Sequence, residues 1–380
     1  MNLPKIQQAK GLKGKRVLLR LGLNVPVKGG RVLDDFRIRK ALPTIEYLKK
    51  KGAKIVIISH IGRNPKESLM PVATHLNNML NVKIGFIPDI ENDTALEIVG
   101  GMPNGGVIVL ENLRVFSGEK ENNASFVKKL VSFGDIYVND AFSVSHRKHA
   151  SIVGIPKYLP SYSGLLFQSE IKHLEMALDP KRPFLFVLGG AKIATKMPLL
   201  RKFAGIADTV FVGGALANDI YKAKGYEVGR SLVDGSAREV KKLVGHNRVF
   251  VPEDVIILGK NGTETRPANE VRKSDMIVDA GPKTRSGFPE MVYSAKFILI
   301  NGPLGNYEKG FDKATKKLLK VASEAPAKVI VGGGDTVALV TKMKLEEKFT
   351  FVSTGGGAML DFLADGKLPG IDAMVKCKHT

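Results

Sequence analysis

The sequence predicts an α/β protein made of two doubly wound domains, each a parallel sheet with helices on both faces. Short, continuous apolar runs alternate with amphipathic helical patterns along nearly the whole chain, as is typical of sheets buried on both faces. The chain has 380 residues, which is long enough for two domains. A segment rich in proline and glycine at 154–164 separates two such series.

The first series is expected to form a domain over residues 1–155. Its continuous apolar runs predict strands, and its segments with one apolar stripe predict helices. The expected strands lie at 16–23, 54–59, 82–87, 106–110 and 135–139, and the expected helices lie at 38–51, 70–80 and 124–133.

The segment at 154–164 interrupts this alternation. A helical pattern follows at 165–178 and is closed by Asp179-Pro180. We therefore expect a hinge and a connecting helix over 156–180.

The second series is expected to form a domain over 181–365. Gly, Pro, Asn or Asp follows almost every apolar run, and open parallel sheets bind ligands outside the carboxyl ends of their strands. One edge of this sheet is therefore the predicted ligand-binding edge. The expected strands lie at 184–188, 209–212, 248–251, 297–300, 328–331 and 349–352, and helical segments at 337–344 and 358–363 follow the last two.

Composition narrows the class of protein. A single cysteine, Cys377, excludes an internal disulfide framework and a cysteine-based metal cluster, and it fits a reducing compartment. We find no signal-peptide core and no apolar run near the ~18 residues of a membrane span. We therefore expect a cytoplasmic protein that does not use a membrane.

The formal net charge of +21 is high. It has two interpretations, a nucleic-acid-binding surface or a lysine-rich solvated surface with a basic site for small anions. The lysines are scattered along the chain and are not interleaved with aromatic residues. We therefore favour the second interpretation and do not expect nucleic acid as the partner.

Two glycine triplets near the C-terminus, within 332–336 and 353–357, indicate phosphate binding. Each lies between an expected strand and an expected helix, where free backbone N–H groups meet the positive end of the helix dipole. Asp335 and Thr336 add oxygens suited to a metal ion on that phosphate. The Walker A, G-x-G-x-x-G, H-E-x-x-H and nucleophile-elbow patterns are missing from the sequence.

Two further strand ends in the second series have polar residues suited to phosphate. Lys192 and Lys196 follow Gly189-Gly190 and are four residues apart, so they share a helix face; they could hold a polyphosphate or be ordinary surface lysines. The turn at 301–305, followed by Glu308, could belong to the site or be an ordinary tight turn.

Arginines gather at the strand ends of the first series. A single arginine is usually a surface residue, but several beside Gly, Asn or His indicate a site for a small polyanion, because guanidinium groups bind phosphate and carboxylate bidentately. The candidate residues are Arg20, Asn24, Arg37, His60, Arg63, Arg114 and Arg147.

These motifs resemble those of the phosphoglycerate kinase family, and their order and spacing agree over essentially the whole chain. The resemblance implies two Rossmann-like domains that face each other across a cleft, with a C-terminal tail at 366–380 packing back on the N-terminal domain. The matching segments are 20–26 (RLGLNVP), 37–44 (RIRKALPT), 59–63 (SHIGR), 110–114 (LENLR), 137–142 (YVNDAF), 146–151 (HRKHAS), 188–192 (LGGAK), 301–305 (NGPLG), 332–336 (GGGDT) and 353–358 (STGGGA).

The resemblance also implies a glycolytic reaction, the reversible transfer of a phosphoryl group between 1,3-bisphosphoglycerate and Mg-ADP, which gives 3-phosphoglycerate and ATP. It implies a monomer whose hinge bends to close the site. Phosphoglycerate would be held by Arg20, Asn24, His60, Arg63, Arg114 and Arg147. Arg37, Lys192 and Gly356 would act on the transferring group. ATP or ADP would be held by Lys196, Asn301, Glu308, Gly333, Gly334, Asp335, Thr336, Gly355 and Gly357, with Mg²⁺ on Asp335.

The chain departs from the family pattern at five positions. Gly22 stands where the family has an aspartate that contacts the hydroxyl of phosphoglycerate, and Ser143 stands where the family has glycine. The other departures are Leu23 for Phe, Thr195 for Asp and Ala215 for Gly.

These departures leave two alternatives to a standard family member. Gly22 suggests a relaxed preference for substrate, including a related carboxylate or acyl phosphate. The net charge suggests a divergent member that binds nucleic acid and keeps weak kinase activity.

Overall fold

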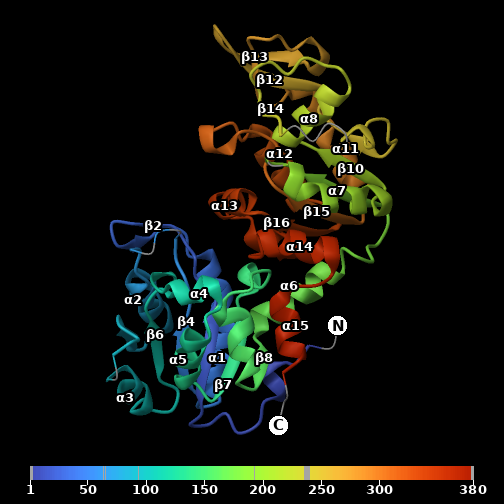
Figure 1. Cartoon of the computed structure of the whole chain (residues 1–380). Coiled ribbons are helices and arrows are strands. Elements are labelled where there is room, and N and C mark those ends of the chain that lie inside the picture. The colour runs from blue at the N-terminus through green and yellow to red at the C-terminus, as the bar shows by residue number, and fades with distance from the viewer. Residues whose placement is uncertain are drawn as a thin grey trace. The chain divides into compact units, whose positions relative to one another are not determined.

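The computed structural model describes residues 3–62, 64, 66–92, 94–191, 193–234 and 240–377, without the side chains of 193 and 194. The chain forms two compact units (Figure 1). We call Met1–Lys172 with Gly366–Thr380 the first unit and His173–Asp365 the second unit.

The first unit is built on a six-stranded sheet in which every pair of neighbours is parallel. The strand order is β5 (Ile84–Ile87), β6 (Val107–Leu110), β4 (Lys54–Ile58), β1 (Arg16–Leu21), β7 (Ile136–Asp140) and β8 (Ser161–Ser163). The expected strands of the first series are therefore confirmed to within a few residues.

Helices cover both faces of this sheet, as alternate side chains of β1 demonstrate. Val17 and Leu19 pack in one core with residues of α1 (Phe36–Lys50) and α2 (Met70–Leu80). Leu18 packs in the other core with residues of α3 (Thr94–Gly100) and α5 (Ala124–Ser132). Since successive strand residues point to opposite faces, the apolar run at β1 fills both cores at once.

Shorter elements complete the first unit. They are β2 (Val27–Lys28), β3 (Arg31–Val32), α4 (Ser117–Glu121), the first part of α6 (Leu165–Glu175), α15 (Pro369–Val375), the 3-10 helices η1 (Ile6–Gln8), η2 (Leu113–Val115), η3 (Phe142–Val144) and η5 (Ile155–Lys157), and the π-helical turn η4 (Ala150–Gly154).

The segment at 154–164 is built into the first unit. β8 pairs with β7, and the N–H of Gly164 donates to the oxygen of Asn139 over 2.9 Å. The boundary between the compact units falls later, after Lys172 inside α6. Proline and glycine here shape tight turns onto an edge strand.

The C-terminal segment belongs to the first unit. α15 packs against η4, and the N–H of Gly370 donates to the oxygen of Ser145 over 2.8 Å. A Cβ atom on Gly370 would lie only 2.9 Å from Ile152 Cγ2, so glycine permits this close approach.

The second unit has a parallel sheet of its own. Its order is β11 (Val249–Phe250), β10 (Thr209–Val212), β9 (Phe184–Leu188), β15 (Phe297–Asn301), β16 (Lys328–Gly332) and β17 (Phe351–Val352). Counted from β9 along the chain, the order is 3-2-1-4-5-6, the doubly wound Rossmann order, whose direction reverses between β9 and β15.

The helices of the second unit connect these strands. α7 packs against α14, and α12 packs against α11 and α13. The helical elements are α7 (Ile193–Ile206), α8 (Ala215–Ala223), α10 (Pro282–Ser286), α11 (Phe288–Tyr293), α12 (Lys313–Ser323), α13 (Gly334–Lys342), α14 (Gly357–Asp365), η6 (Ala268–Glu270), η7 (Tyr307–Lys309) and η8 (Glu346–Lys348).

A small antiparallel sheet in the second unit was not anticipated from the sequence. It has the order β13 (Gly262–Pro267), β12 (Asp254–Gly259), β14 (Met276–Ala280). β13 has no apolar run because its side chains are largely exposed, so its strand character comes from pairing with β12. Among the described residues, no helix is long and apolar enough to cross a membrane.

Candidate active site

The second unit brings two glycine-rich turns together where its strand order reverses. After β9 and β15, the N–H of Gly189 donates to Asn301 O over 2.8 Å and that of Gly190 to Pro303 O over 2.7 Å. A Cβ atom on Gly189 would overlap Pro303 O, and one on Gly302 would overlap Gly189 O. Both positions therefore require glycine, and the turns form one backbone platform at the predicted ligand-binding edge.

Lys196 extends from α7 over this platform. Its Nζ donates to Gly189 O. Burial lowers the pKa of Lys196 to about 8, and the carboxylate of Asp335 opposes that shift. A partly buried ammonium group with few counter-charges suits a phosphate ligand, because phosphate would stabilise the charged form.

A cavity of about 280 Å³ opens beside these turns. Apolar side chains of Leu232, Met276 and Leu304 line one part of it, and the carboxyl groups of Glu308 and Asp335 line another. Its volume is near the lower end of small-molecule sites, about 300 Å³, and the apolar wall suits a flat ring. Sequence reasoning missed Leu232 and Met276, because nothing in their local pattern signals that they meet at this cavity.

Asn218 adds a polar group to the cavity wall. Its Nδ2 donates to Leu232 O over 3.0 Å, whereas its buried Oδ1 has no hydrogen-bond partner among the described residues. A buried acceptor without a partner is costly, so a ligand amino or hydroxyl group would be bound favourably there.

Asp335 and Glu308 form an acidic pair suited to a magnesium ion. Burial raises the pKa of Asp335, the nearby Glu308 raises it further, and Lys196 opposes the shift. A divalent cation would relieve this repulsion, and Mg²⁺ commonly binds one or two carboxylates together with phosphate oxygens. The described residues contain no group of three or more His, Cys, Asp or Glu side chains placed to hold a metal ion.

Gly333, Thr336 and Asn301 lie next to this acidic pair. Gly333 has φ of 91° and its Cβ position lies 3.0 Å from the nitrogen of Gly302, so only glycine fits comfortably. The buried hydroxyl of Thr336 has no partner among the described residues, and Asn301 Nδ2 meets only the sulfur of Met359, at 3.6 Å. Both polar groups are therefore available to a ligand.

The second glycine triplet offers two free N–H groups. The N–H of Gly355 donates to Ser353 Oγ over 3.0 Å and is therefore occupied. The N–H groups of Gly356 and Gly357 have no acceptor in the described part of the chain, and Gly357 begins α14. Two free donors at a helix start can bind an anion.

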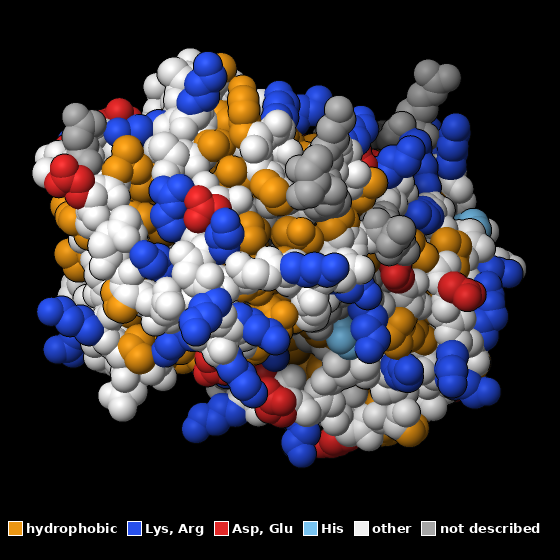
Figure 2. All heavy atoms as spheres, turned by 90° about the horizontal axis from the view of Figure 1, so that it is seen from below, with side chains coloured by type: hydrophobic (Ala, Val, Ile, Leu, Met, Phe, Trp, Pro, Cys, Tyr) orange, Lys and Arg blue, Asp and Glu red, His pale blue; other side chains and the backbone are white. Residues whose placement is uncertain are grey.

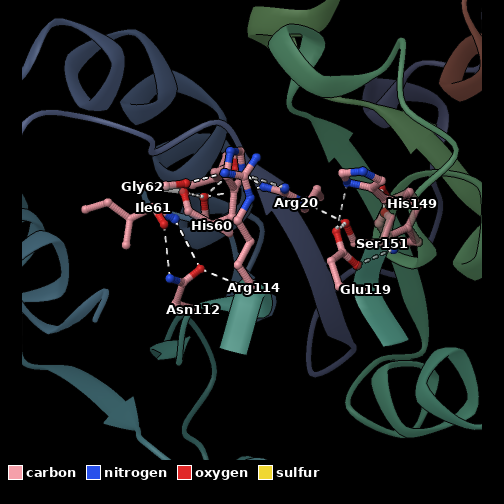
Figure 3. A network of polar contacts seen from close by, with 12 residues as sticks. Arg20, His60, Ile61, Gly62, Asn112, Arg114, Glu119, His149 and Ser151 are labelled. Carbon is pink, nitrogen blue, oxygen red and sulfur yellow. Dashed lines mark hydrogen bonds and ion pairs between the residues drawn. The ribbon is translucent and has the colours of Figure 1, made fainter. Parts of the chain in front are cut away.

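In the first unit, Arg20 is the centre of a buried polar network (Figure 3). Its Nε donates to Ser151 Oγ over 2.9 Å, its Nη1 donates to Leu21 O, and its Nη2 lies 3.0 Å from His60 Nδ1. Burial lowers the pKa of Arg20, and Glu119 opposes that shift. The network holds the guanidinium rigidly at the carboxyl end of β1.

His60, Asn24 and Arg114 meet around one turn. Asn24 Oδ1 accepts the N–H of Gly62 over 2.9 Å, and Arg114 Nη1 donates to Gly62 O. Burial and then the charge of Arg20 hold the pKa of His60 well below its ordinary value. The imidazole stays neutral because the neighbouring arginines make its surroundings strongly positive. Such surroundings suit an anionic ligand.

Glu119 is a member of this network that sequence reasoning missed. Its carboxylate is 1% exposed and accepts the N–H and the hydroxyl of Ser151 over 2.9 and 2.7 Å. His149 Nδ1 lies 3.7 Å away, but burial lowers the pKa of that histidine to about 4, with the arginine charges adding to the shift. A buried carboxylate linked through Ser151 to Arg20 therefore counters the cluster's charge.

The other candidate residues have different positions. Arg37 lies in the first turn of α1, half-buried, where burial lowers its pKa and Glu170 and Asp34 oppose the shift. The charge of Arg37 helps to lower the pKa of His60. Arg147 is exposed, and its charge helps to lower the pKa of His149. Arg63 and Lys192 lie outside the described residues.

Asp140, the last residue of β7, gives a prediction for stability. Its Oδ1 accepts the N–H of Phe167 over 2.8 Å, while its buried Oδ2 has no partner among the described residues. Burial raises the pKa of Asp140 to about 6 from an ordinary 3.8. The folded state therefore disfavours the ionised form, and this group makes stability fall as pH rises from about 4 to about 6.

We expect Asp140→Asn to raise the free energy of unfolding at pH 7 by at most about 3 kcal/mol, since two pKa units correspond to that value. The gain should disappear below about pH 4, where the carboxyl group of Asp140 is protonated in both the folded and the unfolded state. Urea unfolding at pH 4, 5, 6 and 7 would measure it. An equal difference at every pH would contradict the assignment.

Comparison with known proteins identifies the family. The family model described as phosphoglycerate kinase matches residues 6–367. The phosphoglycerate kinase of Coprothermobacter proteolyticus is 40% identical over 99% of both chains. The solved structure of the enzyme from Pyrococcus horikoshii OT3 covers 98% of both chains with 31% identity and a TM-score of 0.88, and that from Coxiella burnetii covers 99% of this chain and all of its own with 34% identity and a TM-score of 0.82. The chain therefore belongs to the phosphoglycerate kinase family, whose members are ATP-dependent kinases.

Proposed function

We propose that this protein catalyses the glycolytic phosphoryl transfer between 1,3-bisphosphoglycerate and ADP, with 3-phosphoglycerate and ATP as the other pair. The observation that supports it most is that each unit has groups suited to an anion: a buried arginine network in the first, and a glycine platform with a cavity in the second. One site suits a small polyanion and the other a nucleotide.

The first unit is proposed to bind the phosphoglycerate. The guanidinium groups of Arg20 and Arg114 would supply the positive charge, with neutral His60 between them (Figure 3). Asn24 supports the Gly62 turn. Arg63 and Arg147 are proposed to complete it. Rigid guanidinium groups bind carboxylate and phosphate bidentately, which holds the acceptor carboxylate in position for transfer.

The second unit is proposed to bind the nucleotide. The cavity would hold base and ribose, with Glu308 on the ribose hydroxyls, while Lys196 and Asn301 contact the phosphates. Gly333, Gly334 and Thr336 would cradle the phosphates, and Gly355, Gly356 and Gly357 would lie near the phosphoryl group. Mg²⁺ on Asp335 would neutralise phosphate charge when bound.

The chemistry needs no general base from the protein. The acceptor is a carboxylate with a reference pKa near ~4, so it is already ionised at neutral pH. The remaining work is positioning and charge neutralisation, which Arg37, Lys192 and the N–H of Gly356 are proposed to perform. Because an exposed acyl phosphate hydrolyses, a hinge-bending motion would close the site and exclude water.

One assay tests the proposed function. ATP consumption is measured with 3-phosphoglycerate and Mg²⁺, coupled to reduction of the acyl phosphate product. We expect saturable turnover with both substrates, and no turnover when 3-phosphoglycerate is omitted. Absence of turnover with pure, folded protein would contradict the proposal.

The role of Asp335 gives a further prediction. Asp335→Asn removes the carboxylate proposed to hold the metal and should raise the Mg²⁺ concentration for half-maximal activity at least tenfold. Asp361→Asn, on α14 of the same unit, is the control and should leave it unchanged. An unchanged magnesium requirement in Asp335→Asn would show that other groups hold the ion.

The high net charge does not favour a nucleic-acid function. On the face shown in Figure 2, Lys and Arg side chains are scattered among acidic, polar and apolar ones and do not form one stripe. A dispersed charge suits general solubility and the attraction of small anions. We propose a cytoplasmic monomer whose partners are its small-molecule substrates.

A further inference from the structure

Two positions at which the chain departs from the family pattern are neighbours in the fold. Gly22 follows β1, and Ser143 lies in η3, which follows the adjacent strand β7. A Cβ atom on Gly22 would lie 2.9 Å from Ser143 Oγ, closer than such atoms normally approach. The hydroxyl of Ser143 therefore occupies the space in which a side chain at position 22 would begin.

The Ser143 hydroxyl is available to a ligand. It is half-buried and has no hydrogen-bond partner among the described residues. By contrast, nearby Ser145 Oγ donates to Ala141 O over 3.1 Å and accepts from Asn139 Nδ2 over 3.3 Å. A hydroxyl that reaches solvent and has no protein partner can donate to and accept from a ligand beside it.

Its position indicates which part of a ligand it meets. Gly22 lies two residues from both Arg20 and Asn24, so the Ser143 hydroxyl borders the anion site of the first unit. Phosphoglycerate has a phosphate, a carboxylate and one neutral hydroxyl. The arginines and neutral His60 suit the anionic groups, which leaves the neutral hydroxyl for a neutral partner that can both donate and accept.

We propose that Ser143 binds the hydroxyl group of the acceptor substrate, and that Gly22 is small so that Ser143 can reach it. This inference rests on the proposed function. In this proposal, the hydroxyl of Ser143 makes the substrate contact that the family's aspartate at position 22 would make.

A neutral contact makes recognition of the substrate hydroxyl weaker and less strict than an ionised one. Ser143→Ala should lower kcat/KM for 3-phosphoglycerate about threefold to tenfold, mainly through KM. With 3-(phosphonooxy)propanoate, which lacks only the hydroxyl, the same substitution should leave the inhibition constant or kcat/KM unchanged.

The second arm of the experiment uses the close approach between position 22 and Ser143 Oγ. Gly22→Asp alone should lower kcat/KM at least tenfold, because the new side chain meets Ser143 Oγ. Gly22→Asp combined with Ser143→Gly should recover most of it, while thermal unfolding verifies that each variant folds. If Gly22→Asp does not fold, the Ser143→Ala comparison decides alone.

The outcomes are separable. Equal effects of Ser143→Ala on both ligands, or no effect on either, would overturn the role of Ser143. Full activity of Gly22→Asp would overturn the steric argument. Failure of the parent protein to consume ATP with 3-phosphoglycerate would instead overturn the proposed function.

Discussion

Replacing Arg37 by alanine is expected to lower kcat by about three orders of magnitude, within the range of an arginine that stabilises a transferring phosphoryl group. The guanidinium is half-buried in the first turn of α1, and its charge helps to lower the pKa of His60 in the proposed phosphoglycerate site. If Arg37 has the proposed role, removal of its side chain takes away a fixed positive charge that would stabilise the transferring group most strongly in the transition state. Steady-state kinetics in both reaction directions would measure the loss.

Two variants give this prediction its controls. Arg39→Ala removes an arginine of the same helix that is paired with Asp35 over 2.8 Å, and it should change kcat less than threefold. Arg37→Lys keeps the charge but loses the planar fork, so partial activity is expected. Near-normal turnover in Arg37→Ala would overturn the assignment.

The same large loss is expected for Lys192→Ala.

Glu119→Ala is expected to lower the free energy of unfolding by about 3 kcal/mol. The substitution removes a carboxylate that is 1% exposed and leaves the N–H of Ser151 without its acceptor. It also removes the negative charge that opposes the lowered pKa of Arg20. The buried guanidinium would then lack its counter-charge. Urea unfolding near pH 7, followed by far-UV circular dichroism, would measure the change.

The control for Glu119 lies on the same short helix. Glu121 is exposed, so Glu121→Ala should change stability by less than about 0.5 kcal/mol. Glu119→Gln should lose less than Glu119→Ala, because its amide oxygen can still accept one of the two bonds from Ser151. Equal stability of Glu119→Ala and the parent would show that Glu119 is not the counter-charge of the network.

Most of the fold could be predicted from the sequence because its signals are local. β4 and β9 are continuous apolar runs, and α2 has one apolar stripe; each pattern reflects burial on both faces or on one face. β13 could not be predicted, since its residues are polar and its strand geometry depends on pairing with β12. β8 could not be predicted for the same reason, because its three residues gain their strand geometry from pairing with β7.

The sequence alone determined the chemistry of the proposed site: the arginines and glycines at strand ends, and the family they indicate. Only the tertiary structure decided how those residues are held. It paired Glu119 with Ser151 behind Arg20, and it brought the hydroxyl of Ser143 to Gly22. The physical reason is that strand-end motifs are encoded locally, whereas counter-charges and close contacts come from residues far apart in the chain that meet only when parallel strands align.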